Sequence, residues 1–120
     1  MKRILVIEDT DDNRQIIRDL LTTVGYELIE AVDGEEGVAA AAREKPDLIL
    51  MDIQLPRMDG YEATRRIKAD PATAHIPVIA VTSYALSGDE EKTRAAGCDA
   101  YIAKPFSPRL LLAKVRELVG

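Results

Sequence analysis

Residues 47–56, DLILMDIQLP, decide the fold of this chain. The apolar run at 48–51 is too short for a buried helix and lies between Pro46 and Pro56, which is typical of an interior strand of a parallel sheet. Asp52 follows directly, and ligands bind at the carboxyl ends of the strands in open α/β sheets. Asp52 is therefore a candidate functional residue, although a simple strand stop or turn cap would also place an aspartate there.

Length and charge limit what the chain can be. Its 120 residues, 47% hydrophobic and 31% charged, suffice for one ordinary core, so we expect a single domain over residues 1–120. The net charge of -5 argues against nucleic acid or an anionic membrane as a partner chosen by charge, because both would repel the surface. An acidic surface instead fits a protein partner or a bound cation.

Cysteine content and hydropathy argue against a disulfide-bonded protein and against a secreted or membrane-spanning one. Cys98 is the only cysteine, so the chain has no internal disulfide, and we expect Cys98 to behave as a small, half-buried apolar residue. The start of the chain resembles a signal peptide only until Glu8 and Asp9 interrupt the apolar residues, and no other stretch could span a bilayer. We therefore expect a cytoplasmic protein.

The chain alternates strands with helices. The expected strands are residues 4–7, 26–31, 48–51, 76–82 and 100–103, with a helix after each. Apolar residues share one face of the first helix (Ile16, Ile17, Leu20, Leu21, Val24). The last helix also has apolar residues (Leu110, Leu111, Ala113, Val115, Leu118, Val119). Such alternation predicts an α/β protein whose parallel sheet has helices on both faces.

Start and stop signals frame these helices. Asp11 or Asp12 is the expected N-cap of the first helix, and Gly25 its C-cap. Capping boxes begin at Asp33, Asp59 and Ser87, and Ser107-Pro108 offers an N-cap followed by proline at the first helical position. The second, third and fourth helices should end near Pro46, Pro71 and Gly97.

Polar residues follow four of the strands. The first strand ends in Glu8-Asp9, the third in Asp52, the fourth in Thr82 and the fifth in Lys104, and parallel strands place these ends at one edge. Three carboxylates gathered there would resist ionisation unless a cation joined them. Hard oxygen ligands favour Mg²⁺ or Ca²⁺, and an incomplete shell open to water suits Mg²⁺ better.

This set of residues suits phosphoryl transfer. That chemistry needs positioning and neutralisation of the phosphoryl oxygens, which Mg²⁺ and a lysine provide, and a carboxylate can be the nucleophile. Asp52 has the central position for that role. Lys104 taken alone could be a surface lysine and Thr82 a strand-ending β-former, but the coincidence of four strand ends favours a site.

Five spaced motifs resemble a known family. They are Ile7-Glu8-Asp9, the MDIQLP of residues 51–56, Met58-Asp59-Gly60, Val81-Thr82-Ser83 and Lys104-Pro105-Phe106. Together they resemble the receiver domain of bacterial two-component response regulators, a CheY-like family, and are particularly similar to single-domain receivers of the DivK type. The resemblance implies a doubly wound, flavodoxin-like (βα)5 fold with strand order 2-1-3-4-5.

The resemblance also assigns roles. Asp52 would accept a phosphoryl group from the phosphohistidine of a sensor histidine kinase or a histidine phosphotransfer protein, and Thr82 and Lys104 would contact the phosphoryl oxygens. Glu8, Asp9, Asp52 and the backbone carbonyl of Gln54 would hold Mg²⁺. Many receivers have two aspartates where this chain has Glu8-Asp9, so the longer Glu8 is a weaker candidate for a direct ligand and would reach the metal through a water.

A conformational switch is implied as well. By this resemblance, Thr82 would move toward the phosphoryl group while Tyr101 turns inward. The movement would alter a surface built by the fourth helix, the fifth strand and the fifth helix. Tyr101 could otherwise be an amphipathic strand residue with its hydroxyl in water. Gln54 and Tyr84 occupy positions that tune hydrolysis of the aspartyl phosphate in the family. The small side chain of Ser83 would leave room for the phosphoryl group. A cis peptide before Pro105 would direct Lys104 into the site.

Two other functions compete with this interpretation. A flavodoxin-like nucleotide carrier would need phosphate-binding amides where Glu8, Asp9, Asp11 and Asp12 repel an anion. A Mg²⁺-dependent phosphatase would need a second acid close after Asp52, where the chain has Ile53 and Gln54. We therefore expect a signalling phosphoacceptor rather than an enzyme.

The remaining features concern the histidine and the output. His75, ahead of the fourth strand, is expected to be structural and no part of a phosphorelay. The chain carries no basic recognition helix after its last helix, so we expect a stand-alone receiver that acts through a downstream protein. The alternative is a receiver domain cut from a longer regulator.

Overall fold

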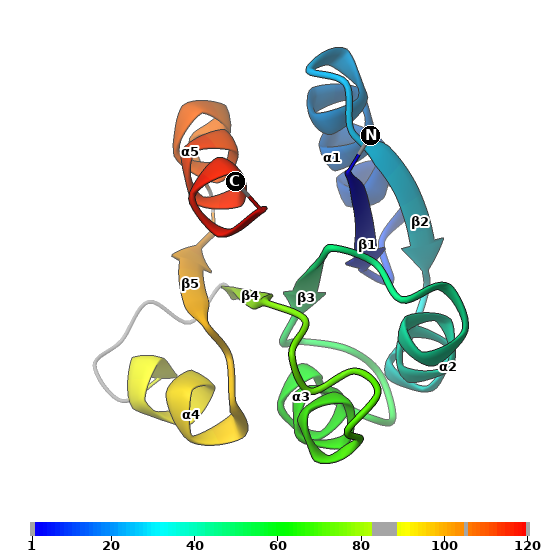
Figure 1. The fold of residues 1–120 in the computed structure, drawn as a ribbon. Coiled ribbons are helices and arrows are strands. Elements are labelled where there is room, and N and C mark those ends of the chain that lie inside the picture. The colour runs from blue at the N-terminus through cyan, green and yellow to red at the C-terminus, as the bar shows by residue number, and fades with distance from the viewer. Residues whose placement is uncertain (1, 83–88, 105, 120) are drawn as a thin grey trace.

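The computed structural model of this protein describes residues 2–82, 89–104 and 106–119. Strands and helices alternate along the whole chain (Figure 1). Their bounds are β1 Arg3–Ile7, α1 Asp11–Thr23, β2 Glu27–Ala31, α2 Gly34–Glu44, β3 Leu48–Asp52, α3 Gly60–Ala69, β4 Val78–Thr82, α4 Asp89–Ala96, β5 Ala100–Ala103 and α5 Pro108–Val119.

The five strands form one parallel sheet in the order β2-β1-β3-β4-β5. Helices α1 and α5 lie on one side of this sheet, and α2, α3 and α4 lie on the other (Figure 1). The predicted flavodoxin-like (βα)5 fold is confirmed. Because β1 and β3 are adjacent at the centre, both of their faces are covered by helices.

Burial on both faces explains the continuous apolar runs of the central strands. In β3, Ile49 and Met51 pack in a core with α2 and α3, whereas Leu48 and Leu50 pack in a second core with α1 and α5. All four side chains are at most 1% exposed. Residues 48–51 therefore need no polar alternation, and Asp52 is the first polar side chain of the strand.

Most of the expected helix signals are observed. The carboxylates of Asp33 and Asp59 accept hydrogen bonds from the backbone N–H groups of Glu36 (2.8 Å) and Glu62 (2.9 Å), and Ser107 Oγ accepts one from Leu110 N at 3.3 Å. The C-cap of α1 is Val24 rather than the predicted Gly25, which follows it. Gly25 and Gly97, after α1 and α4, have φ angles of 97° and 104°, which favour glycine. The Ser87 capping box lies outside the described residues.

Three sequence predictions are corrected. The N-cap of α1 is Thr10, and Asp11 and Asp12 lie in the first helical turn, where the Asp11 carboxylate pairs with Arg14. The fourth strand begins at Val78, because the chain at 70–76 is closed into turns by bonds such as Ile76 N to Thr73 O (3.0 Å).

The third correction concerns helix faces. Ile16 is 56% exposed, since it lies about 100° around α1 from buried Ile17. Val24 is 39% exposed because it is the C-cap, beyond the last helical turn, and Leu110 is also exposed. The buried stripe of α1 is formed by Ile17 and Leu21, and that of α5 by Leu111 and Val115.

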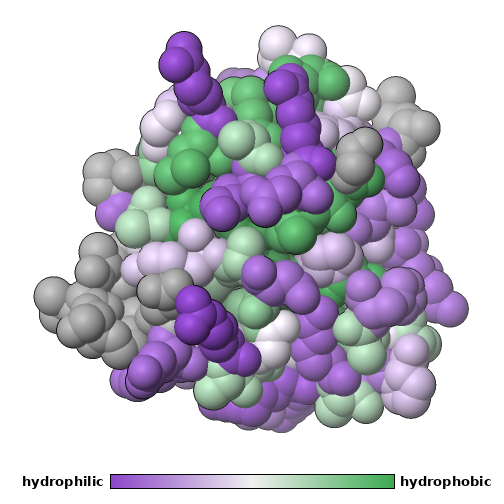
Figure 2. All heavy atoms as spheres, turned by 60° about the vertical axis from the view of Figure 1, so that its left-hand side comes forward, coloured by the Kyte–Doolittle hydropathy of each residue, from purple (hydrophilic) through white to green (hydrophobic). Residues whose placement is uncertain are grey.

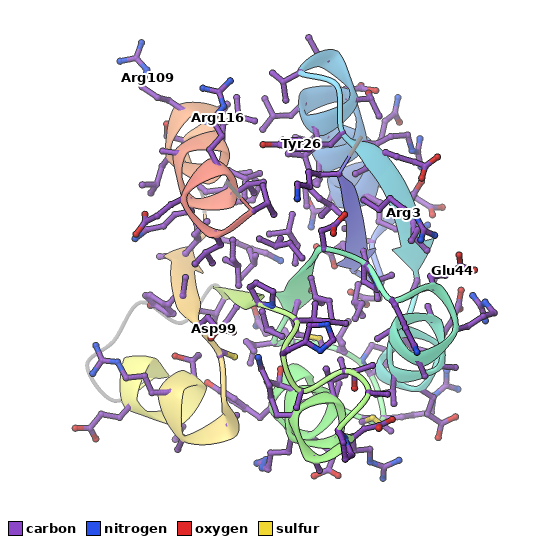
Figure 3. All side chains as sticks on the ribbon, in the orientation of Figure 1. Arg3, Tyr26, Glu44, Asp99, Arg109 and Arg116 are labelled. Carbon is purple, nitrogen blue, oxygen red and sulfur yellow. The ribbon has the colours of Figure 1, made fainter. Side chains whose placement is uncertain are left out.

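The end of the sheet where the strands begin is held by charged residues. Arg3 pairs with Glu44 at 2.6 Å and with Glu27 at 3.1 Å, and Figure 3 shows Arg3 beside Glu44. Asp99, just before β5, accepts bonds from Val78 N (2.9 Å) and Lys68 Nζ (3.0 Å). Among the described helices, none combines the length and apolar character that crossing a membrane requires.

Candidate functional site

The polar residues predicted from the strand ends come together at one edge of the sheet. The register pairs Ile7 with Met51 and Asp52 with Val81, so Glu8 follows β1 next to Asp52, the last residue of β3. Thr82 ends β4 and is paired with Ala103, directly before Lys104. Residues distant in sequence are therefore neighbours because parallel strands end in register.

Three acids form the centre of the site. Glu8, Asp9 and Asp52 each offer a carboxylate oxygen, and these oxygens lie within 4.8 Å of one another. Glu8 is 2% and Asp52 4% exposed, whereas Asp9 is exposed to solvent. The three carboxylates therefore meet at one place, where two are buried and the third is accessible to solvent.

Lys104 lies between the two buried acids. Its Nζ is 3.2 Å from Glu8 Oε1 and 3.3 Å from Asp52 Oδ2. The backbone N–H of Lys104 donates to Thr82 O at 2.7 Å, which fixes the residue at the end of β5. The ammonium group thus offsets part of the repulsion between two carboxylates that burial brings close.

Backbone groups orient the carboxylates. Gln54 N donates to Asp52 Oδ1 at 3.0 Å, and Thr10 N donates to Glu8 Oε2 at 3.4 Å. Each buried acid therefore has one oxygen facing Lys104 and the other facing a backbone N–H. The direction of both carboxylates is set by the loops that follow β1 and β3.

The loop after β3 is held by close packing at two glycines. A Cβ on Gly60 would lie 2.4 Å from Asp52 O, and one on Gly34 would lie 2.6 Å from Met58 O. Gly60 N also donates to Ile53 O at 3.0 Å. Within this loop Arg57 adopts a φ of 64°, and its guanidinium pairs with Asp33 at 3.3 Å. The start of α3 is thereby fixed directly against the end of β3.

The crowding of acids changes the pKa of two of them. Burial raises the pKa of Glu8, its hydrogen bond and charge repulsion with Asp52 raise it further, and Lys104 opposes the change. Burial and the neighbouring Glu8 likewise raise the pKa of Asp9. The site therefore favours any species that adds positive charge.

The donor set fits a hard divalent cation. Within residues 2–82, 89–104 and 106–119, this is the one group of three potential metal-ligating side chains, and all three are carboxylates. Oxygen ligands without imidazole or thiolate suit Mg²⁺ or Ca²⁺. A partial set of protein oxygens, open to solvent through Asp9, is typical of Mg²⁺, which retains several waters.

The two predicted switch residues share one face of the sheet. Thr82 is fully buried, and Tyr101 is half-buried on β5 opposite Ala80. Side chains alternate along a strand, so Ala80, Thr82 and Tyr101 all point to the side of α3 and α4. Ser83, Tyr84 and the peptide before Pro105 lie outside the described residues.

Sequence reasoning missed one buried charge next to the acids. Arg14, with a side chain 10% exposed, donates from Nη1 to the backbone oxygen of Glu8 at 2.7 Å. The only local signal was the spacing of Asp11 and Arg14 on one helical face. The bond to a main-chain carbonyl has no counterpart in the sequence pattern. His75 is exposed in the turn before β4, away from the strand ends that form the site.

Comparison with known proteins agrees with this geometry. The family model described as "Response regulator receiver domain" matches residues 4–116. The polar-differentiation response regulators DivK of Brucella anthropi and Brucella ovis are each 44% identical over 119 residues, which is 99% of this chain and 97% of theirs.

Solved structures give the same result. The receiver domain of a Pseudomonas aeruginosa sensor histidine kinase, with a magnesium ion coordinated in its active site cleft, superposes with a TM-score of 0.92 at 39% identity, covering 99% of this chain and 98% of that one. The chemotaxis protein CheY4 of Vibrio cholerae gives 0.93 at 27% identity and 98% coverage of both chains. With the fold, the strand-end acids and these matches in agreement, this chain belongs to the response regulator receiver domain family.

Proposed function

We propose that Asp52 is the phosphoacceptor of this receiver, and that its donor is the phosphohistidine of a sensor histidine kinase or a histidine phosphotransfer protein. The observation that carries the proposal is the position of Asp52, buried beside Glu8 and Lys104, with Lys104 Nζ 3.3 Å from Oδ2. An Asp52 carboxylate oxygen would attack phosphorus as the bond from phosphorus to the imidazole nitrogen breaks. The imidazole keeps the electron pair of that bond.

Mg²⁺ is the cofactor we propose, held by Glu8, Asp9, Asp52 and the backbone carbonyl of Gln54. When bound, Mg²⁺ supplies positive charge to the phosphoryl oxygens. Both Glu8 oxygens already face donors, Lys104 and Thr10 N, whereas Asp9 is exposed. The exposure of Asp9 supports it as a direct ligand and Glu8 as a residue that acts through a water. Asp52, whose oxygens face Lys104 and Gln54 N, is placed in the ligand set because its carboxylate lies within 4.8 Å of the other two.

Lys104 and Thr82 would bind the transferred group. Lys104 Nζ already lies beside Asp52 Oδ2. It is therefore placed to pair with a phosphoryl oxygen once Asp52 is phosphorylated and the negative charge lies on the phosphoryl group. Thr82, at the end of the adjacent β4, would provide a hydroxyl donor on the other side. The charge change at Asp52 would then reach Tyr101 through Thr82, which lies on the same face of the sheet.

The surface formed by α4, β5 and α5 is the proposed docking site for a downstream protein. Tyr101 lines a hollow of about 230 Å³ on this surface, together with residues of α4 and α5 that include Arg94, Lys114 and Glu117. Figure 2 shows this side of the molecule, with apolar side chains gathered in the upper half of the view and hydrophilic ones covering the lower half. Arg109 points outward from α5 (Figure 3), so this helix presents a positive charge to solvent.

A signalling role in the cytoplasm follows from this chemistry. The phosphohistidine of such donors is formed with ATP. The phosphoryl transfer to Asp52 would therefore take place in the compartment that holds ATP. A phosphatase function has less support, because Asp52 is followed by Ile53 and Gln54 rather than by a second acid. The negative surface also argues against nucleic acid as a partner.

Intact-mass analysis after incubation with acetyl phosphate and Mg²⁺ tests this proposal. The protein should gain the mass of one phosphoryl group, the adduct should be labile at alkaline pH, and Asp52→Asn should remove it. An adduct that persists in Asp52→Asn would contradict the assignment. Continuous hydrolysis of added phosphoesters would instead indicate the phosphatase.

A further inference from the structure

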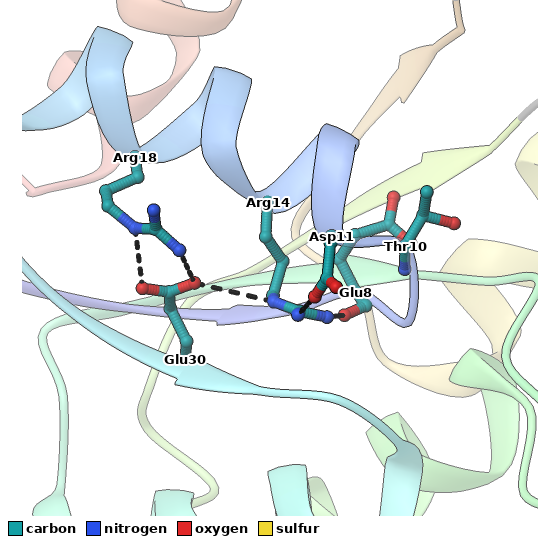
Figure 4. A network of polar contacts seen from close by, with 6 residues as sticks. All are labelled: Glu8, Thr10, Asp11, Arg14, Arg18 and Glu30. Atoms are coloured by element: carbon teal, nitrogen blue, oxygen red, sulfur yellow. Dashed lines mark hydrogen bonds and ion pairs between the residues drawn. The ribbon is translucent and has the colours of Figure 1, made fainter.

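A second group of charged residues lies directly behind the acids. Arg14 of α1 donates from Nη1 to the backbone oxygen of Glu8 at 2.7 Å, pairs with Asp11, and lies 3.5 Å from Glu30 on β2 through Nε. Figure 4 shows the guanidinium between the end of β1, the first turn of α1 and β2. One side chain thus joins three elements next to the proposed metal ligands.

The burial of Arg14 calls for a physical reason. Its side chain is 10% exposed, and a charge removed from water is costly unless several partners offset the loss. Buried ion pairs can often be replaced by apolar residues of similar volume without loss of stability. Stability alone therefore gives no reason for a cation at this position, whereas its bond to the Glu8 carbonyl does.

That carbonyl belongs to the peptide between Glu8 and Asp9. Glu8 N still follows the sheet and donates to Ala31 O at 3.1 Å, at the end of β2. The next polar group of the chain, the Glu8 oxygen, is bound by Arg14 instead. The bond fixes the plane of the peptide that joins the two acidic residues, Glu8 with a buried side chain and Asp9 with an exposed one.

Arg14 is itself held in place. Glu30 receives two hydrogen bonds from Arg18, at 2.8 Å from Nε and 2.7 Å from Nη2, and its Oε1 also faces Arg14 (Figure 4). Arg14 N donates to Thr10 O at 3.0 Å in the first turn of α1. The guanidinium therefore has a fixed position, which a long side chain would otherwise lack.

We propose that Arg14 is a positioning residue for the divalent cation, which sets the Glu8–Asp9 peptide so that both carboxylates converge with Asp52. This inference rests on the proposed Mg²⁺ site. Outer groups that orient metal ligands typically change metal affinity by about 10- to 100-fold when they are removed. Arg14 would belong to that class although it touches a ligand residue only through its main chain.

The sign of the effect separates positioning from simple electrostatics. Arg14 is a cation near a cation site, so removing its charge alone should tighten Mg²⁺ binding. Loss of the bond to the Glu8 carbonyl should weaken it. Arg18→Met provides the matched control, because it removes an equal charge from the same network and leaves the bond from Arg14 to Glu8 O in place.

Calorimetric titration with MgCl₂ tests the inference on the whole chain. Each variant is first shown to be folded by circular dichroism at the temperature of the titration. Arg14→Met should bind Mg²⁺ about 10-fold or more weakly than wild type, and Arg18→Met should bind as tightly as wild type or slightly more tightly. Arg14→Lys, which keeps the charge but has one donor nitrogen in place of three, should fall between Arg14→Met and wild type.

The outcomes are distinguishable. If wild type binds no Mg²⁺, the proposed cofactor site fails. If wild type binds and Arg14→Met matches Arg18→Met, the positioning role is overturned. Should Arg14→Met not fold, Arg14→Gln replaces it, since its shorter side chain cannot reach the Glu8 carbonyl. The same loss of affinity is expected there, and wild-type affinity would overturn the inference.

Discussion

Lys104 Nζ lies 3.3 Å from Asp52 Oδ2, although Asp52 ends β3, Lys104 follows β5, and β4 lies between these two strands. The lysine reaches across the end of the sheet to the central acid. It also contacts Glu8 at 3.2 Å, so one ammonium group is shared by two buried carboxylates. This arrangement is the basis of the predictions below.

Removing the ammonium should destabilise the protein when no divalent cation is present. In Lys104→Met, Glu8 and Asp52 remain buried without their cation, and breaking a buried pair in this way costs about 3–5 kcal/mol when fully buried and less at this partly exposed site. Urea unfolding with EDTA measures the loss, and adding MgCl₂ should restore part of it. Lys114→Met, in a surface pair at 4.0 Å, is the control and should change little. Equal effects in both variants would contradict the role of Lys104.

Neutralising the central acid should have the opposite effect on stability. Asp52→Asn removes one of three crowded charges while its side-chain oxygen can still accept from Gln54 N, so we expect stabilisation of about 1 kcal/mol without Mg²⁺. Urea unfolding in EDTA gives the change. Asp12→Asn, exposed in α1, is the control. A clear loss of stability in Asp52→Asn would show that the carboxylate is not under repulsion.

The stability should fall as the pH rises from the ordinary pKa of a glutamate through the higher pKa of Glu8. Burial and Asp52 raise that pKa in the folded protein, so in this window the folded state binds more protons than the unfolded state. Raising the pH then favours unfolding. Urea titrations between about pH 4.5 and pH 7.5 in EDTA should show a steeper decline for wild type than for Glu8→Gln. Parallel curves would contradict the direction of the pKa change, and saturating MgCl₂ should flatten the wild-type curve.

Gly60→Ala should damage both stability and phosphorylation. The new Cβ would lie 2.4 Å from Asp52 O and 2.6 Å from Ile53 Cα, so the end of β3 or the start of α3 must move. Overpacking of this kind typically costs about 1–3 kcal/mol, and the displaced Asp52 should accept phosphoryl groups more slowly. Gly25→Ala, strained by its φ of 97° but in open space, should lower stability and leave the phosphorylation rate unchanged. Equal rates in the two variants would sink the prediction.

The sequence predicted the strand ends well because each has a local signature. Residues 48–51 are apolar on both faces, and Asp52 ends the run, so its place at the sheet edge follows from the strand alone. The same reasoning located Glu8, Thr82 and Lys104, which the parallel register then brings together.

What the sequence could not predict depends on contacts across the fold. The buried position of Arg14 was not predicted, because its partners, Glu30 on β2 and the carbonyl of Glu8 just after β1, are brought to it only by the fold. Asp11 or Asp12 was expected to cap α1, but the N-cap is Thr10, both acids lie in the first helical turn, and the Asp11 carboxylate pairs with Arg14. Tertiary contacts bury Arg14, whereas the pair of Asp11 with Arg14 is a local contact within α1.

Chemical identification of the phosphorylated residue tests the central claim most directly. The protein is incubated with acetyl phosphate and MgCl₂, reduced with sodium borohydride, which converts an aspartyl phosphate to homoserine, and mapped by peptide mass spectrometry. Homoserine at position 52, absent from the sample prepared with EDTA, is the predicted result. Homoserine at position 9, or a phosphoryl adduct that resists reduction and lies outside the Glu8–Asp9–Asp52 cluster, would contradict it.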